Sequence, residues 1–204
     1  MAELDIARIS KAALHLAGRR GADGFTMRAL ADSLGVTPMA LYRHVADKTA
    51  LVALVLDESL SERRLPSLTG DWREDLWRQA RWSRERALAH PAVYQLHRAY
   101  QTWTPAMIPL AERWTGLWRE SGLTAARATR ASVASSLAVN GYVEAELRLR
   151  SFQPPSAKLL ADVPNARRVV GARPGGEADY ELTVRSLLDG IHTRLASVPA
   201  RRSA

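Results

Sequence analysis

The chain lacks cysteine altogether and has no apolar run long enough to cross a membrane. In a chain of 204 residues, the absence of cysteine excludes disulfides, thiolate metal sites and cysteine nucleophiles, and it fits a reducing compartment. The longest uninterrupted apolar run, residues 50–56, has seven residues, whereas a membrane-spanning helix needs about 20. Residues 1–5 are acidic where a secretory signal would be basic. We therefore expect a soluble, cytoplasmic protein.

Sequence signatures of enzymes are also missing. No glycine-rich phosphate-binding loop occurs, and none of the five histidines stands in a His-x3-His arrangement. The serines lack the local context of a nucleophile elbow. We therefore predict no catalytic residue, no metal site and no cofactor.

Basic residues outnumber acidic ones, 29 to 21, which gives a formal net charge of +8. The excess is not concentrated in one segment that would single out a nucleic-acid binder: residues 1–65 hold nine basic and eight acidic residues, and residues 66–204 hold 20 and 13. Net charge governs solubility and nonspecific attraction to polyanions rather than fold. Charge alone therefore identifies no partner.

Apolar residues recur with helical spacing almost throughout, and no stretch alternates like a strand. This pattern predicts an all-α fold of about nine helices. Turn residues at 66–70 predict a boundary between an N-terminal part, residues 1–65, and a larger helical body, residues 66–204. Prolines and glycines between 154 and 176 indicate a loop with room for one short helix around residues 158–162. The nine expected helices lie near residues 6–20, 27–34, 38–44, 47–64, 71–89, 92–101, 105–121, 124–150 and 178–195.

The three short helices within residues 5–44 have the layout of a helix-turn-helix that reads DNA. Ala31 is small where two helices cross, and Gly35 can adopt the left-handed conformation that such a turn requires. If Leu41 faces the core, an exposed arc without acidic residues remains that could enter a major groove. That arc comprises Met39, Tyr42, Arg43 and His44. Two alternatives stay open: small amphipathic helices in a bundle, and a helix-turn-helix that contacts only proteins.

Two spaced motifs run through this region. The first is Gly21-x-x-Gly24-Phe25-Thr26-x-Arg28-x-Leu30-Ala31-x-x-Leu34-Gly35-Val36, and the second is Leu41-Tyr42-Arg43-His44-Val45-x-x-Lys48-x-x-Leu51. Together they resemble the DNA-binding head of the TetR family of transcriptional regulators. The resemblance implies a three-helix helix-turn-helix head, followed by a C-terminal domain for ligand binding and dimerisation.

The resemblance also implies roles for individual residues of the head. Arg28 would reach a base edge or a phosphate, since arginine paired with guanine is the commonest specific contact. Thr37, Pro38 and Met39 stand where family members vary to select their operators, and Arg43 belongs to the exposed arc. The residues at positions that contact DNA phosphates in the family are Tyr42, His44 and Lys48.

The C-terminal motif Asp179-Tyr180-Glu181-x5-Leu187-Leu188-Asp189-Gly190-Ile191 resembles the last helix of many family members. In them, two helices of each subunit form a four-helix bundle across a twofold axis. By that analogy, residues 124–150 and 178–196 would supply the dimer interface. The apolar stripe that such a bundle needs comprises Leu182, Leu187, Leu188, Ile191 and Leu195. Packing of this stripe within its own chain is the alternative.

All six tryptophans lie between residues 72 and 118. Clustered aromatic side chains can line a pocket for a flat or apolar molecule, although core packing is the commoner use of such residues. The candidate effector-binding residues are His97, Tyr100, Trp103, Trp114, Asn140 and Glu144. His90 and His97 are spaced as in tetracycline-responsive family members, where the second histidine ligates a drug-bound magnesium ion. Arg150 occupies the place of their acidic partner, so we expect His97 to be a neutral hydrogen-bond partner.

The combined prediction is a homodimeric repressor that leaves a palindromic operator in double-stranded DNA when it binds a small, largely apolar or aromatic effector. Three alternatives remain: a ligand-dependent activator, a regulator without a ligand, and a helical protein-interaction module with a degenerate head.

Overall fold

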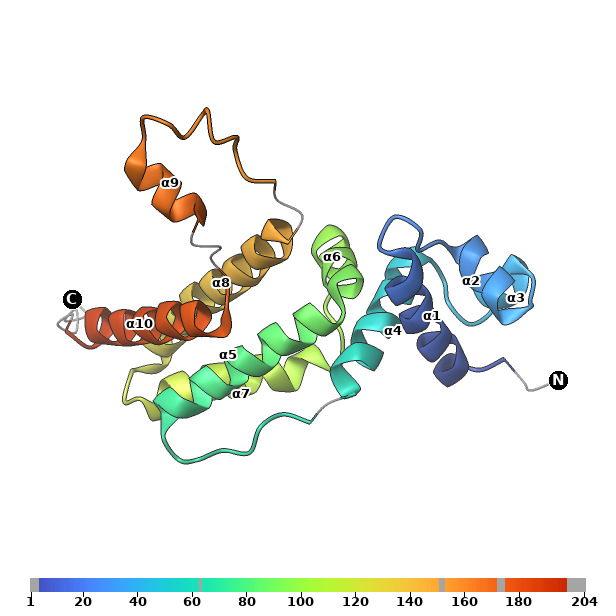
Figure 1. Ribbon diagram of the computed structural model, residues 1–204. Coiled ribbons are helices and arrows are strands. Elements are labelled where there is room, and N and C mark those ends of the chain that lie inside the picture. The colour runs from blue at the N-terminus through green and yellow to red at the C-terminus, as the bar shows by residue number, and fades with distance from the viewer. Residues whose placement is uncertain (1–3, 63, 151–152, 172–174, 198–204) are drawn as a thin grey trace, which may run out of the picture. The chain divides into compact units, whose positions relative to one another are not determined.

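The computed structural model describes residues 4–62, 64–150, 153–171 and 175–197. All regular structure in these ranges is helical, which confirms the all-α class, with ten helices rather than about nine (Figure 1). No helix within them is long and apolar enough to span a membrane. The helices are α1 (Ile6–Arg20), α2 (Met27–Leu34), α3 (Pro38–Tyr42), α4 (Lys48–Ser61), α5 (Trp72–Ala89), α6 (Pro91–Tyr100), α7 (Met107–Glu120), α8 (Ala125–Leu149), α9 (Pro164–Gly171) and α10 (Glu177–Ala196).

Each of the first four helices begins at a side-chain cap. In each case a carboxylate or hydroxyl oxygen accepts a hydrogen bond from the backbone N–H three residues later, which satisfies a donor that the helix itself leaves unpaired. Pro38 also stands at the first position of α3, where its missing N–H costs nothing. The four capping residues are Asp5, Thr26, Thr37 and Asp47.

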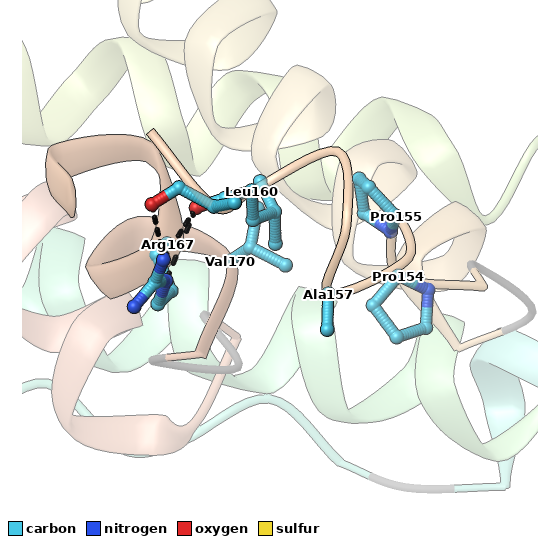
Figure 2. Close-up of a pocket in the computed structure, with 7 residues that line it drawn as sticks. Pro154, Pro155, Ala157, Leu160, Arg167 and Val170 are labelled. Carbon is cyan, nitrogen blue, oxygen red and sulfur yellow. Dashed lines mark hydrogen bonds between the residues drawn. The ribbon is translucent and has the colours of Figure 1, made fainter. Parts of the chain in front are cut away.

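The connection between α8 and α10 differs from the expectation. Residues 157–162 form turns rather than the predicted short helix. A helix, α9, begins instead at Pro164, within the segment that the sequence predicts to be a loop. Proline suits the first turn of a helix because its fixed φ is already helical. The guanidinium of Arg167 donates to the carbonyl oxygen of Leu160, with Nε 3.1 Å and Nη2 2.8 Å away. This bond holds α9 against the turn that precedes it (Figure 2).

The chain forms two compact units. Of the residues that the structure describes, those within 1–66 and 82–113 form the first unit, and those within 67–81 and 114–204 form the second. In the first unit, Ala92, Val93 and Leu96 of α6 are buried in the same apolar core as residues of α1, α2 and α4. Compactness alone does not define a functional domain, so the expected boundary after residue 65 stays a prediction.

The second unit is built around Tyr180 of α10. Its side chain is fully buried, its ring lies 5.6 Å from that of Trp77 and 5.1 Å from that of Tyr142, and its hydroxyl donates to the carbonyl oxygen of Ala80. α8 and α10 pack side by side (Figure 1). Ion pairs join the first half of α5 to α10 in antiparallel order, namely Arg73–Asp189, Glu74–Arg185 and Arg81–Glu177.

Candidate nucleic-acid interface

The turn between α2 and α3 has the backbone geometry that the spacing predicts. Gly35 ends α2 in the left-handed conformation, with φ 67° and ψ 33°. The N–H of Val36 then donates to the carbonyl oxygen of Ala31 at 3.1 Å, which closes the turn. Ala31 and Leu41 are fully buried, as expected. The orientation of α3 is therefore set by a short, closed turn and by an anchor in the core.

The side chains expected to contact DNA lie mostly on the surface. Met39 is 71% exposed and Tyr42 is 47% exposed, which is unusual for large apolar and aromatic side chains. α3 ends at Tyr42 rather than near His44, so Arg43 and His44 lie in the turn that follows. Apart from the half-buried Lys48, the expected set is exposed, namely Arg28, Thr37, Pro38, Met39, Tyr42, Arg43 and His44.

Lys48 is the first residue of α4, directly after the capping carboxylate of Asp47. Its ammonium lies over the ring of Tyr100, the last residue of α6, with Nζ 5.6 Å from the ring centroid. A cation at this distance from an aromatic face is attracted to it. The structure thus pairs an expected DNA-binding residue with an expected effector-binding residue.

The six candidate effector residues divide between the two compact units. His97, Tyr100 and Trp103 belong to the first unit. His97 is half-buried and its Nδ1 atom is buried without a hydrogen-bond partner. Burial of the imidazole, together with the positive charge of Arg98, lowers the pKa of His97, so the ring is neutral near pH 7. Trp103 is 67% exposed.

Trp114, Asn140 and Glu144 belong to the second unit. Trp114 is buried, and its indole N–H donates to Oγ of Ser135 at 3.0 Å, which is how a core tryptophan satisfies its donor. Asn140 is exposed, and Glu144 forms an ion pair with Arg148 one turn later in α8. None of these contacts assigns an effector, so the roles of the six residues stay predictions.

Two cavities are lined by none of the six candidate effector residues, and the sequence did not predict them. One, of about 600 Å³, lies within the connection between α8 and α10 (Figure 2). It is lined by Pro154, Pro155, Ala157, Leu160, Ala161, Arg167 and Val170. The other, of about 210 Å³, lies in the first unit and is lined by Leu60, Ser61, Arg64, Leu65, Trp82, Ala106, Pro109 and Leu110. Both are assembled by folding from residues without a shared motif, so no local pattern could have revealed them.

A charged cluster at the end of α4 was also missed. Oε2 of Glu62 accepts hydrogen bonds from Arg86 and from Nε2 of His90, the latter at 2.7 Å. Burial raises the pKa of Glu62, but the bonds and charges of His90 and Arg86 outweigh it and lower that pKa overall. Glu62 is the C-cap of α4, Arg86 belongs to α5 and His90 is the N-cap of α6. Their separation in the chain hid the contact. In the described ranges, no group of three or more His, Asp and Glu side chains could hold a metal ion.

The expected dimer residues of α10 differ in exposure. Leu182 is 69% exposed, whereas Leu188 is 2% exposed and therefore packs within its own chain. The remaining three, Leu187, Ile191 and Leu195, are half-buried. On α8, Val133 and Leu137 are also large, apolar and more than half exposed, although no sequence pattern singled them out.

Comparisons with known proteins match both parts of the chain. Residues 9–55 match the family described as bacterial regulatory proteins, tetR family, and residues 65–195 match the tetracyclin repressor-like C-terminal domain. The tetracycline repressor protein class A from transposon 1721 of Escherichia coli is 32% identical over 202 residues, which cover 95% of this chain and 93% of that protein. Another curated relative, 30% identical over 152 residues, is covered over only 55% of its own length.

Solved structures of proteins from the same family are also similar to this chain. A possible TetR family transcriptional regulator from Streptomyces coelicolor A3(2) superposes with a TM-score of 0.80 at 26% identity, over 93% of this chain and all of that one. A single-residue variant of TetR from Acinetobacter baumannii AYE, in complex with minocycline, gives 0.68 at 27% identity, over 96% of this chain and all of that one. Both curated relatives are repressors, which are not enzymes. The chain belongs to the TetR family of DNA-binding transcriptional regulators.

Proposed function

We propose that this chain is a homodimeric repressor that binds a palindromic operator through its α2–α3 heads and leaves it when a small molecule binds the body. The observation that carries this proposal is the exposed face of α3, where Met39 and Tyr42 face solvent on a closed helix-turn-helix. Large exposed side chains on a rigidly held element are typical of a binding surface. Such a regulator acts in the cytoplasm, where the bacterial chromosome lies.

Different residues are expected to contact the bases and the phosphate backbone of the DNA. Met39 offers an apolar contact to a thymine methyl group, and Arg28 offers hydrogen bonds to guanine or to a phosphate. Tyr42, His44 and Lys48 contact phosphates. Such contacts fix the register of the protein on the DNA but do not depend on the base sequence. Lys48 adds its charge at the N-terminus of α4, where backbone N–H groups already favour an anion.

Dimerisation would use α8 and α10. Val133, Leu137 and Leu182 leave large apolar side chains on the surface of these two packed helices. A second copy of the chain can cover them through a twofold, self-complementary contact. Two heads related by a twofold axis require two half-sites related in the same way, roughly 34–36 Å apart on the DNA.

The effector is expected to be a small molecule with a flat or apolar body. A similar protein, a variant of TetR from Acinetobacter baumannii AYE, binds minocycline. In this chain, the neutral His97 and the exposed Trp103 suit a ligand that combines an aromatic surface with a hydrogen-bonding group. Release of DNA then requires that the effector bind more tightly to the conformation that fits the operator poorly.

A footprint on the DNA that flanks the gene of this protein tests the proposal. The wild type should protect two symmetric half-sites, and the double variant Tyr42→Ala with Lys48→Ala should lose protection while it remains folded and dimeric. Lys158→Ala is the matched control, since Lys158 is an exposed lysine far along the chain from the head. Asymmetric protection, or protection that survives the double variant, would contradict the proposed use of the heads.

A further inference from the structure

The contact between Lys48 and Tyr100 joins two residues that are remote in the chain. Lys48 belongs to the start of α4 beside the helix-turn-helix, and Tyr100 ends α6. Nζ of Lys48 lies 5.6 Å from the centroid of the tyrosine ring. Nothing in the DNA-binding motif predicts this contact.

The position of Tyr100 is set by packing against the apolar core of the first unit. α6 packs against α1 and α4, and Leu96, one turn before Tyr100, is 3% exposed in their shared core. Tyr100 itself is half-buried and packs on that same core, which includes Leu51 and Val55 of α4. The ring is therefore anchored to the helix that carries Lys48.

The backbone after Tyr100 is fixed as well. Gln101 adopts the left-handed conformation, with φ 48°, and its N–H donates to the carbonyl oxygen of His97 at 2.8 Å. A few residues later, the N–H of Ala106 donates to Oδ1 of Asp57 in α4 at 3.0 Å. The segment that follows the tyrosine is thus tied back to α4.

A fixed ring can hold a flexible lysine. A lysine side chain is a chain of four carbons joined by rotatable bonds, and it loses considerable rotamer entropy when it is held in one place. The face of an aromatic ring attracts the ammonium without occupying its N–H donors in conventional hydrogen bonds, which leaves them available for a phosphate. Holding the ammonium in place before DNA arrives lowers the entropic cost of the phosphate contact.

We propose that Tyr100 is a positioning residue for Lys48, so that a side chain of α6 contributes to operator affinity from outside the helix-turn-helix. The inference rests on the proposed phosphate contact of Lys48. Because a cation–π contact at a partly exposed site is worth a small fraction of the total affinity, the loss of the ring should weaken DNA binding about two- to fivefold.

A double-mutant cycle tests this on full-length protein, with a labelled duplex of the DNA flanking the gene. Tyr100→Leu and Lys48→Met should each weaken binding, and Tyr100→Leu should have no further effect once Lys48 is replaced. Tyr100→Phe keeps the ring and should bind like the wild type. Tyr94→Leu, the same change at another tyrosine of α6, is the matched control and should leave the affinity unchanged.

Nuclear magnetic resonance gives a second readout, which a merely structural role would not move. The ring current of Tyr100 should shift the Lys48 side-chain methylene resonances upfield in the wild type and in Tyr100→Phe, but not in Tyr100→Leu. If Lys48→Met weakens DNA binding but Tyr100→Leu does not, the inference is wrong and the proposed function stands. If Lys48→Met itself leaves the affinity unchanged, the phosphate contact is wrong, and the inference fails with it.

Discussion

At the scale of the residue, His97 is a half-buried histidine whose Nδ1 atom has no partner. Burial and the neighbouring charge of Arg98 lower its pKa below the ordinary 6.5. Between the lowered pKa and 6.5, the unfolded chain binds a proton that the folded chain does not. The free energy of unfolding should therefore fall as the pH falls through this range. Above the range, His97 causes no such loss of stability.

Substitution of His97 makes this measurable. The variant His97→Gln should show a flatter dependence of the free energy of unfolding on pH than the wild type as the pH falls below the ordinary pKa of 6.5. Urea denaturation at fixed protein concentration gives both curves. His15→Gln, at an exposed position of α1, is the control. Parallel curves for wild type and His97→Gln would show that His97 is not the group responsible.

Gly35 is the residue on which the helix-turn-helix geometry depends. Its φ of 67° lies in the left-handed region, so an added side chain is strained even though no atom lies within 4 Å of the new Cβ. Gly35→Ala should lower the free energy of unfolding by about 1–2 kcal/mol. Gly18→Ala, at an exposed helical position of α1, should instead raise it by about 0.5–1 kcal/mol. Equal effects of the two changes in a thermal or urea melt would contradict the turn geometry.

At the scale of the element, the cluster of Glu62, Arg86 and His90 fastens the end of α4. The Arg86 side chain is only 11% exposed, so loss of its carboxylate partner leaves a poorly solvated charge. Glu62→Gln should cost about 1 kcal/mol at neutral pH, since the carboxylate is itself 40% exposed and solvent screens the pair.

The pH dependence of this effect gives the check. The pKa of Glu62 is lowered from 4.5, so the pair stabilises the fold above that pH, and its contribution is lost as the pH falls through the lower value. The difference between wild type and Glu62→Gln in urea denaturation should shrink accordingly below about pH 4.5. A difference that is constant with pH would mean that packing, not charge, holds the end of α4.

Sequence patterns predicted elements well where local chemistry decides and poorly where packing decides. The caps at Thr26, Thr37 and Asp47 are local signals, and the helices start where these residues stand. By contrast, α9 begins at a proline that also reads as a loop marker. The burial of Leu96 beside α4 depends on a packing arrangement that no short window of sequence contains.

The same distinction applies to the candidate site. Exposure of Met39 and Tyr42 follows from the helical period of α3 and could be predicted. The contact of Lys48 with Tyr100 and the buried hydrogen bond of Trp114 could not, because each needs two elements in place. Leu188 shows the limit of an apolar stripe, since a buried and an interfacial leucine look alike in sequence.

At the scale of the whole molecule, the proposed dimer depends on apolar side chains that the single chain leaves exposed. Leu137→Glu places a charge on a residue of α8 that is 68% exposed, so the fold should survive while the twofold contact fails. Sedimentation should show a monomer, with weaker operator binding. Ile108→Glu, at a 57% exposed residue of α7, is the control and should leave the dimer intact. A dimeric Leu137→Glu would place the interface elsewhere.

Sequence-selective binding of DNA is the most direct test of the whole account. Fluorescence anisotropy with the duplex flanking the gene, measured across a salt series, should show tight binding that weakens steeply as salt rises, because phosphate contacts release counterions. A scrambled duplex of equal length should bind far more weakly at every salt concentration. Weak binding to both duplexes, followed by failure to select any preferred sequence from random DNA, would contradict the proposed repressor.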